Sequence, residues 1–356
     1  MAVSLLPGRF TRDFRIERNR QREAAMRAGA SAIVQVLDET WTADSVAKYA
    51  ESAGRASRTL GTDVAFPQLY LTREAAGRLF TAAGLSLDQL WRRAGASGFR
   101  PVPLTGLTAS VGLPVESVDQ GRAPNVVAMI PGSDPTLRNE YVVVSAHMDH
   151  VGVGQPVNGD SIYNGADDDG SGTTGLLEVA QAFASLGQRP KRTIVFLHVS
   201  GEEKGLLGSE WFSDHPTLPL GQIVANINVD MIGRNNPDSV VVIGKDYSSL
   251  GGVANRLAAA HPELRLTLSD DIWPEERFFF RSDHFNFARK EVPAIFFFSG
   301  VHPDYHQPSD EVDKIDTDKA TRISRMIFYL ANDIANDPQR PKWDPKGLAE
   351  VRAMTR

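Results

Sequence analysis

Histidines and carboxylates gather at four places where the sequence predicts the end of a strand. Apolar runs over 141–146, 192–199, 223–229 and 294–298 have the length and branching of buried strands. Each run is followed by groups that can bind a cation or move a proton: His147 and Asp149; Glu202 and Glu203; Asp230; and His306. Ligands of open α/β sheets bind beyond the carboxyl ends of the strands. We therefore expect these groups to converge on one catalytic or cation site.

Three consecutive aspartates, Asp167, Asp168 and Asp169, precede Gly170-Ser171-Gly172 and a helical pattern. Aspartates at a helix start can simply cap the helix. Here the rest of the chain supplies matching ligand types, so we favour a cation site.

The sequence contains no cysteine, so any metal must be held by imidazole and carboxylate groups. Such a donor set suits zinc, with manganese or cobalt as weaker options. Two cations a few ångströms apart need a ligand that spans them, and a carboxylate has two oxygens for this purpose. Of two adjacent glutamates, one can bind metal while its neighbour takes a proton from water.

The order and spacing of these motifs over residues 125–336 resemble the dizinc aminopeptidases of peptidase family M28. The resemblance is carried by His147-x-Asp149, Gly165-Ala166-Asp167-Asp168-Asp169-Gly170-Ser171-Gly172, Glu202-Glu203, Asn228-Val229-Asp230-Met231, Arg281-Ser282-Asp283-His284 and Tyr305-His306.

The resemblance implies a role for each matching residue and two Zn²⁺ per chain. Asp168 would bridge both ions. His147 and Asp230 would complete one zinc site, and Glu203 and His306 the other. Glu202 would be the general base, and Tyr305 would donate to the oxyanion. Asp149 would orient His147, Asp310 would orient His306, and the Asp168–Asp169 peptide bond would be cis.

The expected function is that of an aminopeptidase acting on peptides, and other functions remain open. A carboxypeptidase or dipeptidase of the glutamate carboxypeptidase type would need arginines for the substrate carboxylate, for which Arg234 and Arg281 are candidates. A glutaminyl cyclase would use one zinc, and an inactive receptor-like protein would have lost ligands. His150, His284 and His302 lie near the site in sequence, and we favour structural roles for them.

Strand–helix alternation from residue 123 predicts an α/β, three-layer sandwich with a mixed, mostly parallel central sheet between helices. Its helices are expected over 173–186, 206–213, 248–260 and 317–336, and a further strand over 240–244. We expect this catalytic domain over 123–340 and a mobile tail over 341–356, which contains two prolines.

Residues 1–122 carry no such acidic or histidine cluster and predict a small α/β module. Strands are expected over 30–37 and 64–71, helices over 17–28, 73–83 and 86–94, and extended chain over 107–118. Residues 17–38 resemble the second half of a protease-associated domain. We therefore expect the parent protein to carry an upstream segment with an export signal, and to be periplasmic or secreted. If the short form is natural, the module is complete and the protein cytoplasmic.

Composition limits the classes of partner. The net charge is −6, which argues against nucleic acid or an anionic membrane as the main partner. No apolar run approaches the ~20 residues of a membrane span. A hydrophobic content of 42% supports a full-sized core. The oligomeric state stays open.

Overall fold

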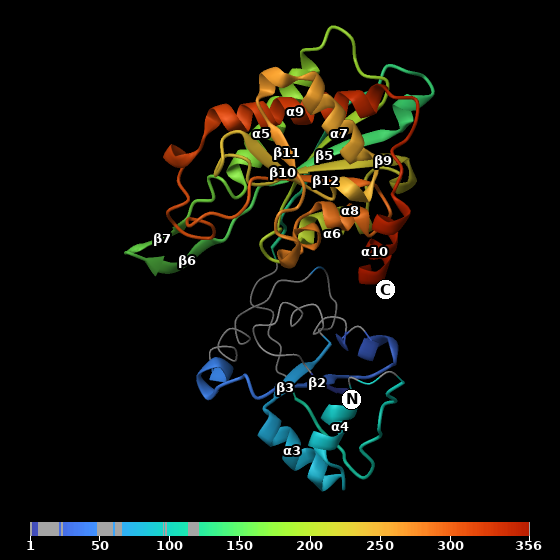
Figure 1. Ribbon diagram of the computed structural model, residues 1–356, viewed down its shortest axis with the longest axis vertical. Coiled ribbons are helices and arrows are strands. Elements are labelled where there is room, and N and C mark those ends of the chain that lie inside the picture. The colour runs from blue at the N-terminus through green and yellow to red at the C-terminus, as the bar shows by residue number, and fades with distance from the viewer. Residues whose placement is uncertain are drawn as a thin grey trace. The chain divides into compact units, whose positions relative to one another are not determined.

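The computed structural model describes residues 2–5, 21–22, 24–47, 60, 66–94, 96, 98–112 and 121–355 (Figure 1). The chain divides into two compact units, Met1–Gln120 and Gly121–Arg356. The predicted boundary lies two residues beyond the observed one. Among the helices described, none is long and apolar enough to cross a membrane.

The described residues of the N-terminal unit form a three-stranded parallel sheet, short helical segments at 21–22, 24–27 and 43–47, and two longer helices. The strands are β1 (Ala2–Leu5), β2 (Ile33–Val36) and β3 (Gln68–Leu71), with β2 in the middle. The helices are α3 (Arg73–Ala82), whose N-cap Thr72 accepts from the N–H of Ala75, and α4 (Leu87–Ala94). Their apolar sides enclose a small core with Val36 and Phe80.

The sequence predicted β2, β3, α3 and α4, but not β1. The helix predicted over 17–28 is present at 21–22 and 24–27, and residues 17–20 and 23 lie outside the described chain. Residues 107–112 form no strand, and the remainder of the predicted extended stretch, 113–118, is also outside the described residues.

The second unit is built on a seven-stranded sheet in the order β11-β10-β12-β9-β5-β8-β4. The strands are β4 (Val126–Ile130), β5 (Tyr141–His147), β8 (Thr193–Val199), β9 (Ile223–Val229), β10 (Ser239–Ile243), β11 (Thr267–Ser269) and β12 (Ala294–Phe298). Strands β8, β5, β9 and β12 run parallel, whereas β4 and β10 are antiparallel to their neighbours β8 and β12. The predicted mixed, mostly parallel sheet is therefore confirmed.

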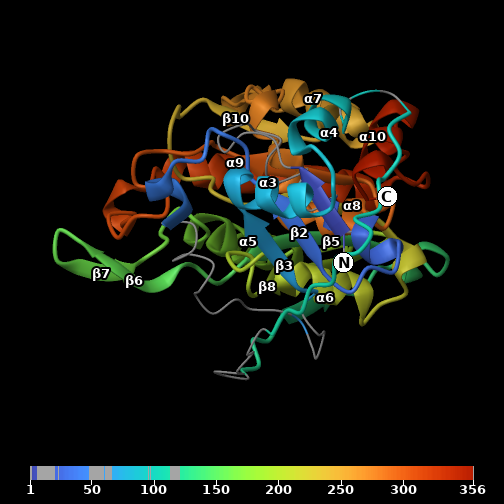
Figure 2. The same cartoon turned by 90° about the horizontal axis from the view of Figure 1, so that it is seen from below.

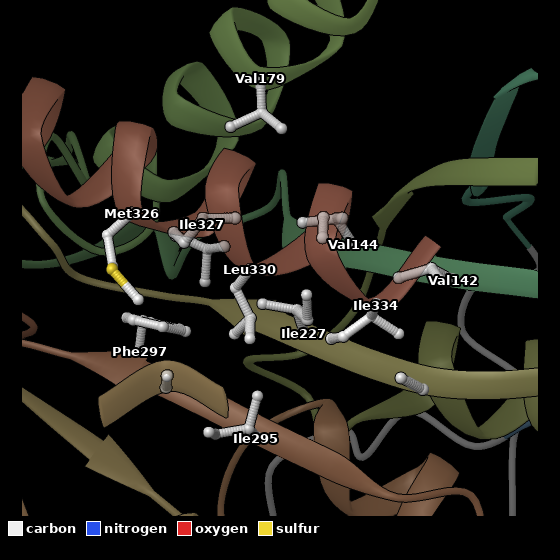
Figure 3. Close-up of a cluster of buried hydrophobic side chains, with 14 of the residues drawn as sticks. Val142, Val144, Val179, Ile227, Ile295, Phe297, Met326, Ile327, Leu330 and Ile334 are labelled. Carbon is white, nitrogen blue, oxygen red and sulfur yellow. The ribbon is translucent and has the colours of Figure 1, made fainter. Parts of the chain in front are cut away.

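One face of this sheet is covered by α5 (Gly170–Ala184), α7 (Ser249–Ala260) and α9 (Thr317–Asn336). The branched side chains of the strands and the apolar side of α9 meet there. Figure 3 shows Met326, Ile327, Leu330 and Ile334 of α9 against Ile227 of β9 and its neighbours. All four α9 residues are at most 2% exposed, so this helix is anchored by burial.

The opposite face packs against α6 (Leu207–Asp214), α8 (His284–Ala288) and α10 (Pro345–Thr355). α10 differs from the mobile tail expected over 341–356. Its Val351 is 1% exposed and joins the aromatic cluster of Phe278, Phe279 and Phe298. The prediction took the prolines as a sign of irregular chain. Pro345 instead occupies the first position of a helix, which tolerates proline.

A two-stranded antiparallel ribbon, β6 (Gly152–Val157) and β7 (Asp160–Tyr163), was not predicted. Both views show it extending away from the sheet (Figures 1 and 2). In the sequence, this ribbon lies between His147 and Asp168. The short elements η1 (Leu137–Asn139), η2 (Leu220–Gln222), η3 (Lys245–Tyr247), η4 (Pro262–Leu264), η5 (Pro274–Glu276), η6 (Phe278–Phe280) and η7 (Val312–Lys314) complete the unit.

Candidate metal centre

The predicted site residues meet at the carboxyl ends of four parallel strands. β5 ends on His147, β8 leads into Glu202 and Glu203, and β9 leads into Asp230. β12 leads into the loop that carries His306. Because these strands are parallel neighbours, their ends lie along one edge of the sheet.

Asp168 lies between two histidines that are far apart in the sequence, His147 and His306. Its Oδ1 is 3.3 Å from Nε2 of His147, and its Oδ2 is 3.1 Å from Nε2 of His306. His147 Nε2 is also 3.6 Å from Oδ1 of Asp230, and His306 Nε2 is 3.1 Å from Oε2 of Glu203. Each oxygen of one carboxylate thus faces a separate imidazole–carboxylate pair.

The neighbours of Asp168 point elsewhere. Asp169 caps α5 by accepting from the N–H of Gly172, and it also accepts from the N–H groups of Met231 and His147. Asp167 accepts from the N–H of Gly233. The Asp168–Asp169 peptide bond is cis, as expected. Backbone donors thus bind both oxygens of Asp169 and Oδ1 of Asp167, while Oδ2 of Asp167 lies 3.3 Å from Nε2 of His302. Among these three aspartates, Asp168 alone has each of its two oxygens beside a different imidazole.

Some possible ligand atoms at this centre have no hydrogen-bond partner among the described residues, which suits a metal site. They include Nε2 of His147 and Oδ1 of Asp230. An unpaired polar atom in a buried position costs free energy unless it binds something. Imidazole and carboxylate donors suit zinc, so the residues present fit the metal that the sequence implies.

His150 also belongs to this centre, although the sequence favoured a structural role for it. Its Nδ1 is 2.7 Å from Oε1 of Glu203 and 3.8 Å from Oδ2 of Asp168. Its Nε2 has no hydrogen-bond partner among the described residues. The sequence signal was its place one residue after Asp149, in the same strand-end loop.

Among the residues that the structure describes, two groups of three side chains come close enough to hold an ion each. They are His147, Asp169 and Asp230, and His150, Asp168 and Glu203. For the first group we favour Asp168 over Asp169, since three N–H groups already occupy the oxygens of Asp169. For the second, His150 and His306 both reach Glu203, and either can serve as the imidazole ligand.

Asp149 and Asp310 lie beside the centre. Asp149 contacts the ring of His147 as expected, although through its main-chain carbonyl, whereas Asp310 contacts the Asp168 loop. The ring Nδ1 of His147 lies 3.0 Å from the main-chain carbonyl of Asp149, while the Asp149 carboxylate accepts from the N–H of Glu202. The Oδ2 of Asp310 accepts from the N–H groups of Asp167 and Asp168, so this carboxylate holds the Asp168 loop where a contact with His306 was expected. Sequence spacing could not distinguish these partners, because the partner depends on how the loops fold back.

Burial and neighbouring charge set the proton affinity of Glu202. Burial raises its pKa well above the usual value; the charge of His147 opposes this shift, and the carboxylates of Asp283 and Asp230 add to it. A carboxyl group with a raised pKa can both take and return a proton near neutral pH. Burial likewise raises the pKa of Tyr305, whose ring stacks on that of His306 with centroids 3.9 Å apart. The phenol is therefore kept in its donor form.

A chain of buried polar groups supports Asp230 from inside the sheet. Asn226 donates to Ser145, Ser145 to Asn228, Asn228 to Ser282, and Ser282 to Oδ2 of Asp230, with distances of 2.7–2.9 Å. This arrangement leaves Oδ1 of Asp230 facing His147. The orientation of the carboxylate is therefore fixed from β5 and β9.

Neither arginine considered for a substrate carboxylate is free of carboxylate partners. Arg281 pairs with Glu276 at 3.0 Å and lies over the ring of Phe278. Arg234 pairs with Asp304 at 2.8 Å. Their existing partners weaken the carboxypeptidase interpretation.

Comparison with known proteins agrees with this geometry. The sequence profile of peptidase family M28 matches residues 125–331, which are 207 of the 356 residues. The chain belongs to peptidase family M28. The matched region includes every predicted zinc ligand, the predicted base Glu202 and Tyr305.

Among M28 relatives, a probable leucine aminopeptidase of Arthroderma otae is 29% identical over 222 residues, covering 60% of this chain and 58% of its own length. Leupeptin-inactivating enzyme 1 of Streptomyces exfoliatus is 29% identical over 213 residues, covering 60% of this chain and 43% of its own. This chain thus spans about half the length of the curated relatives it matches.

Solved structures show the same fold. The Legionella pneumophila LapA aminopeptidase has a TM-score of 0.50 and 25% identity, covering 61% of this chain and 56% of its own. The zinc aminopeptidase BSAP of Bacillus subtilis has a TM-score of 0.51 and 18% identity, covering 95% and 71%.

Proposed function

We propose that this M28 member is a zinc-dependent aminopeptidase that removes N-terminal residues from peptides. One observation carries the proposal: the two oxygens of Asp168 face His147 and His306, each of which lies beside a second carboxylate. A carboxylate so placed can bridge two cations, and a pair of metals supports hydrolytic chemistry.

The chain's own residues divide the work. Two zinc ions, when bound, would polarise the scissile carbonyl and acidify a shared water. His147, Asp230 and Asp168 would hold one ion; Glu203, Asp168 and an imidazole, His306 by the resemblance, would hold the other. Glu202 accepts the proton of the attacking water and returns it to the leaving amine, and Tyr305 donates a hydrogen bond to the oxyanion.

Two alternatives fit less well. A glutaminyl cyclase would use one zinc, yet both halves of the centre retain their ligand types. A carboxypeptidase would need a cation free to bind the substrate carboxylate, and Arg234 and Arg281 already have carboxylate partners.

For the N-terminal unit we propose a protease-associated-like module. Its support is the likeness of residues 17–38 to such a domain and the observed small parallel sheet. Export from the cytoplasm stays a prediction, which fractionation of the native host's cells would check.

The decisive experiment combines zinc analysis with a substrate panel. We expect two zinc ions per chain, and cleavage of aminoacyl-anilides and free-amino peptides but not of N-blocked peptides. Cleavage of N-blocked peptides from their C-terminus would contradict the aminopeptidase proposal. A single zinc with cyclisation of N-terminal glutamine would favour the cyclase.

A further inference from the structure

Asp310 accepts hydrogen bonds from the main chain of the loop that carries Asp168. The Asp310 side chain is fully buried. Its main-chain carbonyl accepts from the N–H of Ala166, and its Oδ2 accepts from the N–H groups of Asp167 and Asp168. Three consecutive residues of the Asp168 loop are therefore hydrogen-bonded to this one residue.

The loop that presents Tyr305 and His306 is held through Asp304. Its Oδ1 accepts from Ser309 and Lys314, each at 2.7 Å, and its Oδ2 accepts from Nη2 of Arg234 at 2.8 Å.

Arg234 lies between these two loops. Its other terminal nitrogen, Nη1, is 3.8 Å from Oδ1 of Asp310. Within the described chain both of these atoms are buried and have no hydrogen-bond partner. Arg234 itself is fixed at its main chain, since Lys319 donates to its carbonyl oxygen and the side chain is only 16% exposed.

From this arrangement we propose that Arg234 is a positioning residue, which joins the Asp168 loop to the Tyr305–His306 loop and so shapes the metal position on the His306 side. The inference rests on the proposed dizinc function. Arginine suits the task because one planar guanidinium can serve two carboxylates in different directions, which a lysine ammonium cannot reproduce.

The role predicts an asymmetric effect on the two metals. The His147 side is held by β5 and β9, whereas the His306 side depends on the loop that Asp304 anchors, and the ion pairs of Arg234 are with Asp304 and Asp310. Loss of such an outer partner weakens metal binding by ~10- to 100-fold. Arg234→Met should therefore weaken one of the two zinc ions and leave the other within about threefold.

The test is competition between the purified chain and a chromophoric zinc chelator, which resolves the two zinc equivalents. Arg234→Met should weaken the same equivalent that His306→Ala removes. Asp304→Asn should cause a similar loss, and the double variant should lose little more than either single one. If Arg234→Met folds poorly, Arg234→Lys replaces it in the test. This variant keeps the charge but not the planar guanidinium, so it should lose an intermediate amount of zinc affinity.

The matched control is Arg256→Met, which removes an arginine–aspartate pair of the same length, with Asp333 between α7 and α9; it should leave both zinc affinities unchanged. Unchanged affinities in Arg234→Met, or equal weakening of both equivalents, would overturn the proposal. A raised KM with unchanged zinc affinities would instead assign Arg234 to the substrate. A native chain that binds no zinc would overturn the dizinc function together with this inference.

Discussion

The two candidate metal positions of this centre are built in different ways. His147 is 1% exposed and ends a central strand. Its Nδ1 lies against the carbonyl of Asp149, its main-chain N–H donates to Asp169, and its carbonyl oxygen accepts from Thr173. The His306 side chain is 38% exposed and lies on a loop with a left-handed φ of 54°. One position is part of the sheet, whereas the other depends on how loops are tied together.

This difference predicts the order in which metal is lost. A chelator should abolish activity completely, and zinc should restore it. During partial chelation the ion at the His306 side should leave first, because that side is more exposed and less constrained. Elemental analysis of half-depleted native protein and of the His147→Ala and His306→Ala variants would check the order. Full activity in metal-free protein would refute the dizinc function.

A substitution at the end of the sheet away from the centre should lower the free energy of unfolding without weakening either zinc ion in particular. Arg192, at the opposite end of β8 from the glutamates, is fully buried; it pairs with Glu140 at 2.6 Å and donates to Ile334, Asp337 and Pro338 at the end of α9. Arg192→Met should lower the free energy of unfolding by about 3–5 kcal/mol, as for other broken buried pairs.

Urea denaturation of the metal-free forms measures this change. The control is Arg265→Met, which removes an exposed pair with Asp318 and should change stability by less than about 1 kcal/mol. If Arg192→Met binds one zinc less while unfolding normally, the separation between sheet and centre is wrong.

Replacing the base should alter turnover while both metal positions stay filled. Glu202→Gln keeps the size of the side chain but cannot take the proton, so kcat should fall by ~100-fold or more. Zinc content should remain two per chain. Near-normal kcat in this variant would show that Glu202 is not the base.

The smallest expected effect is on the free energy of unfolding at acid pH. It comes from His284, two residues after Ser282, which donates to Asp230. Burial lowers the pKa of His284 to about 3, so the ring is neutral in the folded chain. The unfolded chain binds a proton below about pH 6.5, which means that stability is lost as pH falls below that value. Between pH 7 and pH 5 the loss is about 2 kcal/mol for this one group. His284→Phe should flatten this part of the stability profile; an unchanged slope would contradict the assignment.

The sequence predicted the strand ends that meet at the centre, because buried parallel strands read as continuous runs of branched residues. The resemblance to family M28 also implied the two imidazole–carboxylate pairs, His147 with Asp230 and His306 with Glu203. The sequence did not predict the part played by His150, or that Asp310 holds the Asp168 loop rather than His306. Those contacts join residues about 50 and 140 positions apart through loop folds that no local periodicity encodes.

The buried chain from Asn226 to Asp230 also bears on how the sheet assembles. The apolar residues of β5 and β9 are largely interchangeable, so hydrophobic contact alone would allow these strands to pair out of alignment. Ser145 lies opposite Asn228 in the observed pairing. A shift by one residue would place Ser145 opposite Ile227 and leave the Asn228 amide buried without its partner, at a cost of about 1–3 kcal/mol. The polar groups that orient a metal ligand therefore also select one strand alignment during folding, so catalytic geometry and folding accuracy depend on the same few side chains.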